Sequence, residues 1–262
     1  MDRIQTIIGK EWAEVFKNRL VLFTVTLLPI LLTAMPLLVL NSTKGTSIPG
    51  PNTTDLTATF GSVCAGIPVQ DCMQVYLANE FLLLFMILPV MIPITIAAYS
   101  IVGEKTTHSL EPLLATPITT FELLAGKTLA AVIPAIVATW GCFFIFILLL
   151  PVVGVSKAVI SYITGPTWML AVLIIGPLMA VLAVNFAVII SSRVNDPRVA
   201  EQFSVVLLLP ILIVLFGQIA GIVSVNLQLV LIAIVAFILI DIGGIYLGST
   251  LFQRETILTR WR

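Results

Sequence analysis

Six long stretches of this chain are apolar enough to cross a lipid bilayer, and they limit the folds open to it. A bilayer core about 30 Å thick is crossed by roughly 20 apolar residues in a helix. Each stretch reaches that length, and five of them contain no Asp, Glu, Lys, Arg or His. They are Leu20–Leu40, Phe81–Val102, Thr128–Val153, Thr167–Ile190, Phe203–Val223 and Leu227–Phe252. The sequence predicts an all-α integral membrane protein with six transmembrane helices in a single domain over residues 1–262.

The composition excludes the main alternatives to a helical membrane protein. The chain is 59% hydrophobic and 10% charged, with a mean hydropathy of +1.15, whereas soluble domains carry about 25% charged residues. Membrane barrels are built from strands of about 10 residues with alternating polarity, which these stretches do not show. The formal net charge of zero argues against a nucleic-acid partner.

The distribution of Lys and Arg predicts the orientation, because short cytoplasmic loops are enriched in both. Six spans place both termini on one side of the membrane. The opposite side has only Lys44 and Lys157. Eleven basic residues share the side of the termini: Arg3, Lys10, Lys17, Arg19, Lys105, Lys127, Arg193, Arg198, Arg254, Arg260 and Arg262. We therefore expect both termini, residues 103–127 and the 191–202 loop to be cytoplasmic.

Residues 1–19 precede the first span and are predicted to form an amphipathic helix. A Trp-bearing apolar face with basic flanks is typical of a helix that lies in the membrane interface. Such a helix either anchors the chain or also transmits motion into the first span. Its apolar face is Ile4, Ile7, Ile8, Trp12, Val15 and Phe16.

The segment 41–80 is predicted to be an external loop. It contains two of the three cysteines, Cys64 and Cys72. A disulfide between them is chemically allowed outside the cytoplasm. The sequence leaves open whether the bond forms.

Residues 103–127 form a polar island between two apolar stretches. Its charges surround a short apolar set, Leu110, Leu113 and Leu114. A plain connecting loop has no need of an apolar helical face, so the island is predicted to contain a short helix that docks a soluble partner.

Motifs for chemistry are missing from the chain. The sequence has no GxxxxGK[ST] phosphate loop, no HExxH, no GxSxG and a single histidine. These absences predict a protein that is not itself an enzyme, with no catalytic residues, no metal site and no ATP hydrolysis by the phosphate-loop route.

Asp241 is the one charged residue well inside a span. A carboxylate at that depth costs a few kcal/mol unless it is partnered or hydrated. It is either a cation or proton site, part of a substrate path, or a hydrogen-bonded helix contact. Asn185 and Gln218 are candidates for its partners.

Three segments together resemble one family. Glu104-Lys105, then Ser109-Leu110-Glu111-Pro112-Leu113-Leu114-Ala115-Thr116-Pro117, then Gly126-Lys127 resemble the first cytoplasmic loop of ABC-2 type transporter permeases. That loop has the form E-K-x-x-x-(S/T)-L-E-x-L-L-x-(T/S)-P followed by G-K. The run Ser192–Arg198 and the tail Phe252–Trp261 are also similar to this family. Pro112 departs from the pattern.

The resemblance implies a permease subunit of an exporter in the cell (plasma) membrane. Transport would proceed by alternating access. A separate ABC ATPase subunit would bind ATP and Mg²⁺, and this chain would hold no cofactor. A second copy or a sister permease would complete the pathway, as a homo- or heterodimer surrounded by membrane lipids. The residues implied in ATPase coupling are Glu104, Lys105, Leu110, Glu111, Leu113, Leu114, Thr116 and Pro117.

Two other functions remain open at this point. One is an ATP-independent channel or secondary transporter that uses Asp241, Gln218 and Asn185. The other is a membrane anchor that docks soluble proteins. The residues do not indicate a substrate.

Overall fold

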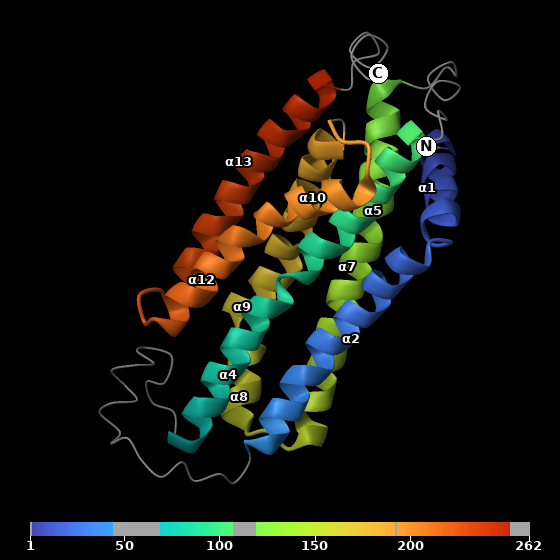
Figure 1. The fold of residues 1–262 in the computed structure, drawn as a ribbon. Coiled ribbons are helices and arrows are strands. Elements are labelled where there is room, and N and C mark those ends of the chain that lie inside the picture. The colour runs from blue at the N-terminus through green and yellow to red at the C-terminus, as the bar shows by residue number, and fades with distance from the viewer. Residues whose placement is uncertain (1, 44–68, 107–118, 192, 252–262) are drawn as a thin grey trace.

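The computed structural model describes residues 2–43, 69–106, 119–191 and 193–251, and every regular element in these ranges is helical (Figure 1). Within them, six helical segments are long and apolar enough to cross a membrane. The prediction of an all-helical protein with six spans is therefore confirmed. The elements are α1 (Asp2–Val15), α2 (Arg19–Ser42), α4 (Val69–Phe85), α5 (Leu88–Thr106), α7 (Thr120–Val153), α8 (Lys157–Ile163), α9 (Pro166–Leu170), η2 (Ala171–Ile175), α10 (Gly176–Ser191), α11 (Pro197–Ser204), η3 (Val205–Leu208), α12 (Leu209–Ile219) and α13 (Leu227–Leu251).

The second span, α4 and α5, is the centre of the bundle. The most apolar 18-residue stretch of this span is 78% buried in the bundle, whereas the corresponding stretch of the sixth span, α13, is 11% buried. The helix breaks between α4 and α5, where Pro89 follows at the start of α5. Proline lacks an N–H group and disfavours helical geometry in the residue before it.

The second and third spans are longer than the sequence indicated. The second candidate span covers Asp71–Glu104, so the end of the predicted external loop 41–80 is helical. Its polar residues lower the mean hydropathy of this segment, so the apolar length of the sequence did not indicate a span there. Cys72, Val75 and Ala78 recur at helical spacing and are buried. Packing of this one face therefore stabilises the helix here. In the third span, α7 begins at Thr120, inside the predicted island 103–127.

The fourth span contains a π-helical turn that a proline helps to explain. In η2 the N–H of Gly176 donates to the carbonyl of Ala171, five residues earlier. Pro177 has no N–H to offer the next carbonyl, that of Val172. The indole N–H of Trp140 on α7 donates to that carbonyl instead, at 3.2 Å. A backbone group freed within the membrane is thus paired by a neighbouring helix.

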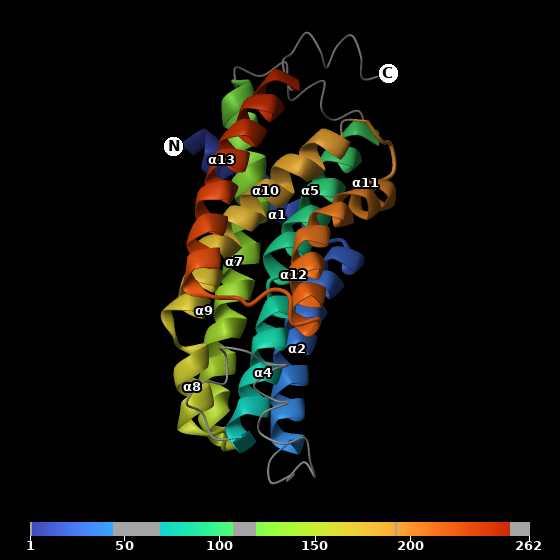
Figure 2. The same cartoon turned by 90° about the vertical axis from the view of Figure 1, so that its left-hand side faces the viewer.

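The fifth and sixth spans pack on different neighbours. The helix α12 packs against α4, whereas α13 packs mainly against α10. Figure 2 shows α13 toward the left of the bundle and α12 to its right. Both carry large exposed apolar side chains, such as Ile213, Phe216, Leu239 and Ile242. Such surfaces are suited to contact with lipid or with another membrane helix.

Residues 2–15 form α1, as the sequence predicted, and α1 packs along α7 and α5. Ile7 and Val15 on its apolar face are buried. Gly126 makes the close approach to α7 feasible, because a Cβ atom there would lie 2.8 Å from Cγ2 of Ile7. The indole N–H of Trp12 donates to the carbonyl of Ala130 at 2.9 Å. The helix is thus fixed against the third span at two places.

Candidate functional site

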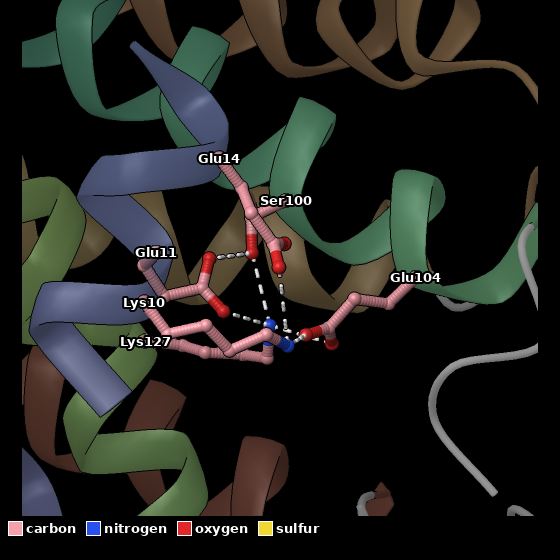
Figure 3. A network of polar contacts seen from close by, with 6 residues as sticks. All are labelled: Lys10, Glu11, Glu14, Ser100, Glu104 and Lys127. Carbon is pink, nitrogen blue, oxygen red and sulfur yellow. Dashed lines mark hydrogen bonds and ion pairs between the residues drawn. The ribbon is translucent and has the colours of Figure 1, made fainter. Parts of the chain in front are cut away.

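Charged side chains from α1, α5 and α7 meet in one buried cluster (Figure 3). Lys127 Nζ lies 2.6 Å from Glu11 Oε1 and 2.7 Å from Glu104 Oε2. Lys10 Nζ lies 2.7 Å from the other oxygen of Glu104. Ser100 donates to Glu11 and accepts from Lys127 at 2.9 Å. We call these five residues the ion cluster.

The ion cluster links helices that are far apart in sequence. Lys10 and Glu104 are 94 residues apart, and Glu11 and Lys127 are 116 apart. Glu104 lies in the last turn of α5, and Lys127 lies near the start of α7. The two flanks of residues 107–118 are therefore joined to each other and to α1.

Burial makes this arrangement sensitive to the loss of any one charge. The side chains of Glu11, Glu104 and Lys127 are each 4% exposed. Buried ions lose hydration, and their mutual attraction compensates only when their partners are present. Removing one charge would strand the others, so the three helices are expected to keep a fixed arrangement while the cluster is complete.

Lys10 closes the cluster toward solvent, with 34% of its side chain exposed. Partial burial disfavours its charged form, but the hydrogen bond and the charge of Glu104, with smaller effects from Glu14 and Glu11, raise the pKa of Lys10 above its ordinary value. Lys10 is therefore a cation throughout the neutral range.

The start of α7 is capped immediately after residues 107–118. Thr119 accepts a hydrogen bond from the N–H of Glu122, and the Glu122 carboxylate accepts one from the N–H of Thr119. This reciprocal arrangement is a capping box, which satisfies backbone donors at a helix start. Arg3 of α1 lies 3.8 Å from the same carboxylate. A second charged contact thus connects α1 to this helix start.

The structure places the predicted coupling residues unequally. Glu104 is buried in the ion cluster, so a direct contact with a partner would require the cluster to open. Lys105 lies in the last turn of α5. The other predicted contacts lie outside the described residues: Leu110, Glu111, Leu113, Leu114, Thr116 and Pro117. Their role stays a prediction.

Three members of the cluster, Lys10, Glu11 and Ser100, are absent from the residues that the sequence indicated. A signal for Glu11 exists in the sequence. It is four residues from both Ile7 and Val15, so it shares their face of α1. A carboxylate in an apolar stripe requires a partner, although its identity cannot be read from periodicity.

Asp241, Asn185 and Gln218 are also buried, at 5%, 4% and 6% exposure. Asn185 of α10 lies against Gly244 of α13. A Cβ atom added to Gly244 would lie 3.5 Å from the side-chain amide nitrogen of Asn185. Gly244 is three residues from Asp241, which brings Asn185 and Asp241 to the same helix interface. Gln218 lies on α12. Among the described residues, neither carboxylate oxygen of Asp241 has a hydrogen-bond partner.

The cysteines fall partly within the described ranges. Cys72 is buried in the first turn of α4 and forms a disulfide. Cys64 lies outside the described residues, so its pairing with Cys72 stays a prediction. Cys142 is free. The described part of the chain contains no group of three His, Cys, Asp or Glu residues that could hold a metal ion.

The six long apolar helices define a multi-pass membrane protein. A family model described as ABC-2 family transporter protein matches residues 5–252. The chain belongs to this family, as its loop motifs suggested. No match was found among curated proteins. ABC-2 permeases are membrane components that work with ABC ATPase partners, and they are not enzymes themselves.

Proposed function

We propose that this chain is the membrane-spanning subunit of an ATP-driven exporter in the plasma membrane. A separate ABC ATPase subunit would bind ATP and Mg²⁺ on the cytoplasmic side, where both termini and residues 103–127 would lie. Two permease subunits, identical or sister, would enclose the substrate path. The family match over residues 5–252 supports the class of protein.

The ion cluster is the observation that carries the proposal. It connects the end of α5, the start of α7 and α1 through buried charges. A force applied to residues 107–118 would reach the second and third spans together and would also move α1. Alternating access requires a connection between ATPase movement and helix packing.

Contact with the ATPase is assigned to Leu110, Leu113 and Leu114. A few residues that fill a well-packed pocket on the partner carry most of the binding energy of an interface. Glu104, Lys105 and Glu111 would contribute polar contacts at its rim, Glu104 when the ion cluster opens. Thr116 and Pro117 would end the contact before α7 begins.

Coexpression with candidate ABC ATPase subunits tests the proposal. The wild-type chain should copurify with an ATPase, whereas Leu113→Asp/Leu114→Asp should lose it. The control is Ile222→Asp, which places one such charge at a residue 82% exposed between α12 and α13. This control should retain the ATPase.

The results separate the three functions. If Leu113→Asp/Leu114→Asp retains the ATPase, residues 107–118 are not the docking element. If the inserted wild-type chain recruits no ATPase, the permease function is wrong and gradient-driven flux through Asp241 becomes the function to assay. If an ATPase binds but no substrate alters its turnover, the chain is an anchor.

A further inference from the structure

We propose that the start of α2 binds an anionic phospholipid of the surrounding bilayer, with the headgroup at Arg19 and an acyl chain in a groove along the helix. This inference concerns a bound lipid and no cargo, so it does not rest on the exporter function proposed above.

The groove lies on the outer face of α2 and has a volume of about 300 Å³. Its lining consists of Arg19, Leu22, Phe23, Thr26, Leu27 and Ile30, and residues at these spacings share one face of a helix. Figure 1 shows α2, in blue, along the right-hand edge of the bundle. Leu22, Phe23 and Ile30 are 50%, 61% and 54% exposed, so the described part of the chain leaves this face uncovered.

The groove has the length of one bilayer leaflet. From Arg19 to Ile30 the helix rises by about 16 Å, at about 1.5 Å per residue, and half of a bilayer core is about 15 Å. The candidate span begins at Val21, which puts Arg19 at the edge of the apolar core and Ile30 near its middle. A lipid of one leaflet matches this extent, whereas another transmembrane helix would follow α2 across the whole core.

Beyond Arg19 the wall of the groove suits a hydrocarbon chain. Its one hydroxyl group, on Thr26, donates to the carbonyl of Leu22 at 2.7 Å and is therefore already satisfied within the helix. A polar molecule held against such a wall would lose hydrogen bonds to water, whereas an acyl chain has none to lose. The groove therefore favours a ligand with a charged group at one end and a hydrocarbon tail.

Positive charge at the start of α2 indicates the sign of the headgroup. Arg19 and Lys17 are exposed, and neither forms an ion pair with any residue that the structure describes. Glu14, the nearest acid before them in the chain, lies 3.8 Å from Lys10. A guanidinium group binds phosphate through paired hydrogen bonds. Zwitterionic headgroups carry a cation beside their phosphate, so an anionic headgroup suits this position better.

The test measures how strongly lipids with bromine on their acyl chains quench a tryptophan placed in the groove. Phe23→Trp adds this probe to the full chain in nanodiscs, and the signal of the wild-type chain is subtracted. Brominated phosphatidylglycerol and brominated phosphatidylcholine each compete with unlabelled phosphatidylcholine. The probe should prefer the phosphatidylglycerol about fivefold or more, since each cation near a membrane surface attracts an anionic lipid by about that factor.

Charge variants of the probe chain separate Arg19 from the general charge of the protein. Arg19→Gln should lower the preference about fivefold, and Arg19→Lys should retain most of it. The matched control, Arg198→Gln, removes the same charge from an exposed position on α11 and should leave the preference unchanged. A second probe, Phe144→Trp, is 45% exposed in the middle of α7 and should show no preference.

Salt provides a measurement that needs no charge variant, in case Arg19→Gln fails to insert. Raising the salt from about 0.1 M to about 1 M shortens the screening length from about 10 Å to about 3 Å and should weaken the preference of the Phe23→Trp chain. Equal quenching by the two lipids, a preference that survives Arg19→Gln or high salt, or the same preference at Phe144→Trp would overturn the proposal. Weak quenching by both lipids would overturn it too, because a protein surface such as a second copy would then cover the groove.

Discussion

The ion cluster and Asp241 both place carboxylates in the interior of the bundle, but of these only the carboxylates of the ion cluster have charged partners among the described residues. In the cluster, Glu11 and Glu104 have ammonium partners within 2.7 Å. Asp241 is equally buried, at 5% exposure, yet the described residues give its carboxylate no hydrogen bond. The first region holds three helices together, while the second leaves one group unsatisfied.

The difference indicates two roles for buried charge in one bundle. A paired cluster resists separation of its helices, because every charge depends on the others. An unpartnered carboxylate contributes nothing to cohesion and can respond to a proton or a ligand. Variants that remove one charge at a time should therefore have very different effects in the two regions.

The largest effect is expected for Lys127→Met. This change strands Glu11 and Glu104 without their shared cation and should lower the free energy of unfolding by about 3–5 kcal/mol. Denaturation of the purified chain in detergent would measure it. Combining the change with Glu11→Gln and Glu104→Gln removes the stranded charges and should restore much of the loss. A single variant as stable as wild type would show that the cluster does not stabilise the bundle.

A smaller effect is expected for Gly126→Ala, which tests the docking of α1. The added Cβ would lie 2.8 Å from Cγ2 and 3.0 Å from Cβ of Ile7, so α1 must move away from α7. Overpacking of this kind costs about 1–3 kcal/mol, and the Glu11–Lys127 contact should loosen with it.

The control is Gly141→Ala in the same helix, where a Cβ meets nothing within 4 Å. This change should stabilise slightly, because alanine favours a helix over glycine by about 1 kcal/mol. If both alanine variants behave alike in thermal unfolding, α1 is not packed tightly against Gly126.

A weaker effect is expected for Lys10→Met, compared with the exposed Lys17→Met. The side chain of Lys10 is 34% exposed, and Glu104 keeps Lys127 as a partner when Lys10 is removed, so the loss should be about 1 kcal/mol. The raised pKa of Lys10 means that its contribution is complete below the ordinary value of 10.5 and is lost as pH rises through the higher folded-state pKa. Unfolding at neutral pH should separate the two variants slightly. A loss as large as that of Lys127→Met would mean that Lys10 is the main cation of the cluster.

The sequence predicted the spans better than the sites, for a physical reason. Apolar length is a local signal, and the six spans followed from it. The amphipathic pattern of residues 1–19 is local too, and it predicted the helix that the structure has at Asp2–Val15. The start of α4 was missed because its polar residues mask the buried stripe of Cys72, Val75 and Ala78. The ion cluster depends on contacts across 94 and 116 residues, which no periodicity encodes. Asp241 was found because it is the one charge inside a span, but its lack of a partner required coordinates.

The smallest effect on stability is expected for Asp241→Asn, and it completes the comparison. The amide keeps the shape of the carboxyl group and breaks no hydrogen bond among the described residues, so the free energy of unfolding should not fall by more than about 1 kcal/mol. Glu104→Gln makes the same chemical change at a carboxylate with two ammonium partners and should cost clearly more. Both are measured by detergent denaturation at neutral pH. If Asp241→Asn is as damaging as Glu104→Gln, Asp241 holds helices together after all, and the contrast between the two regions is wrong.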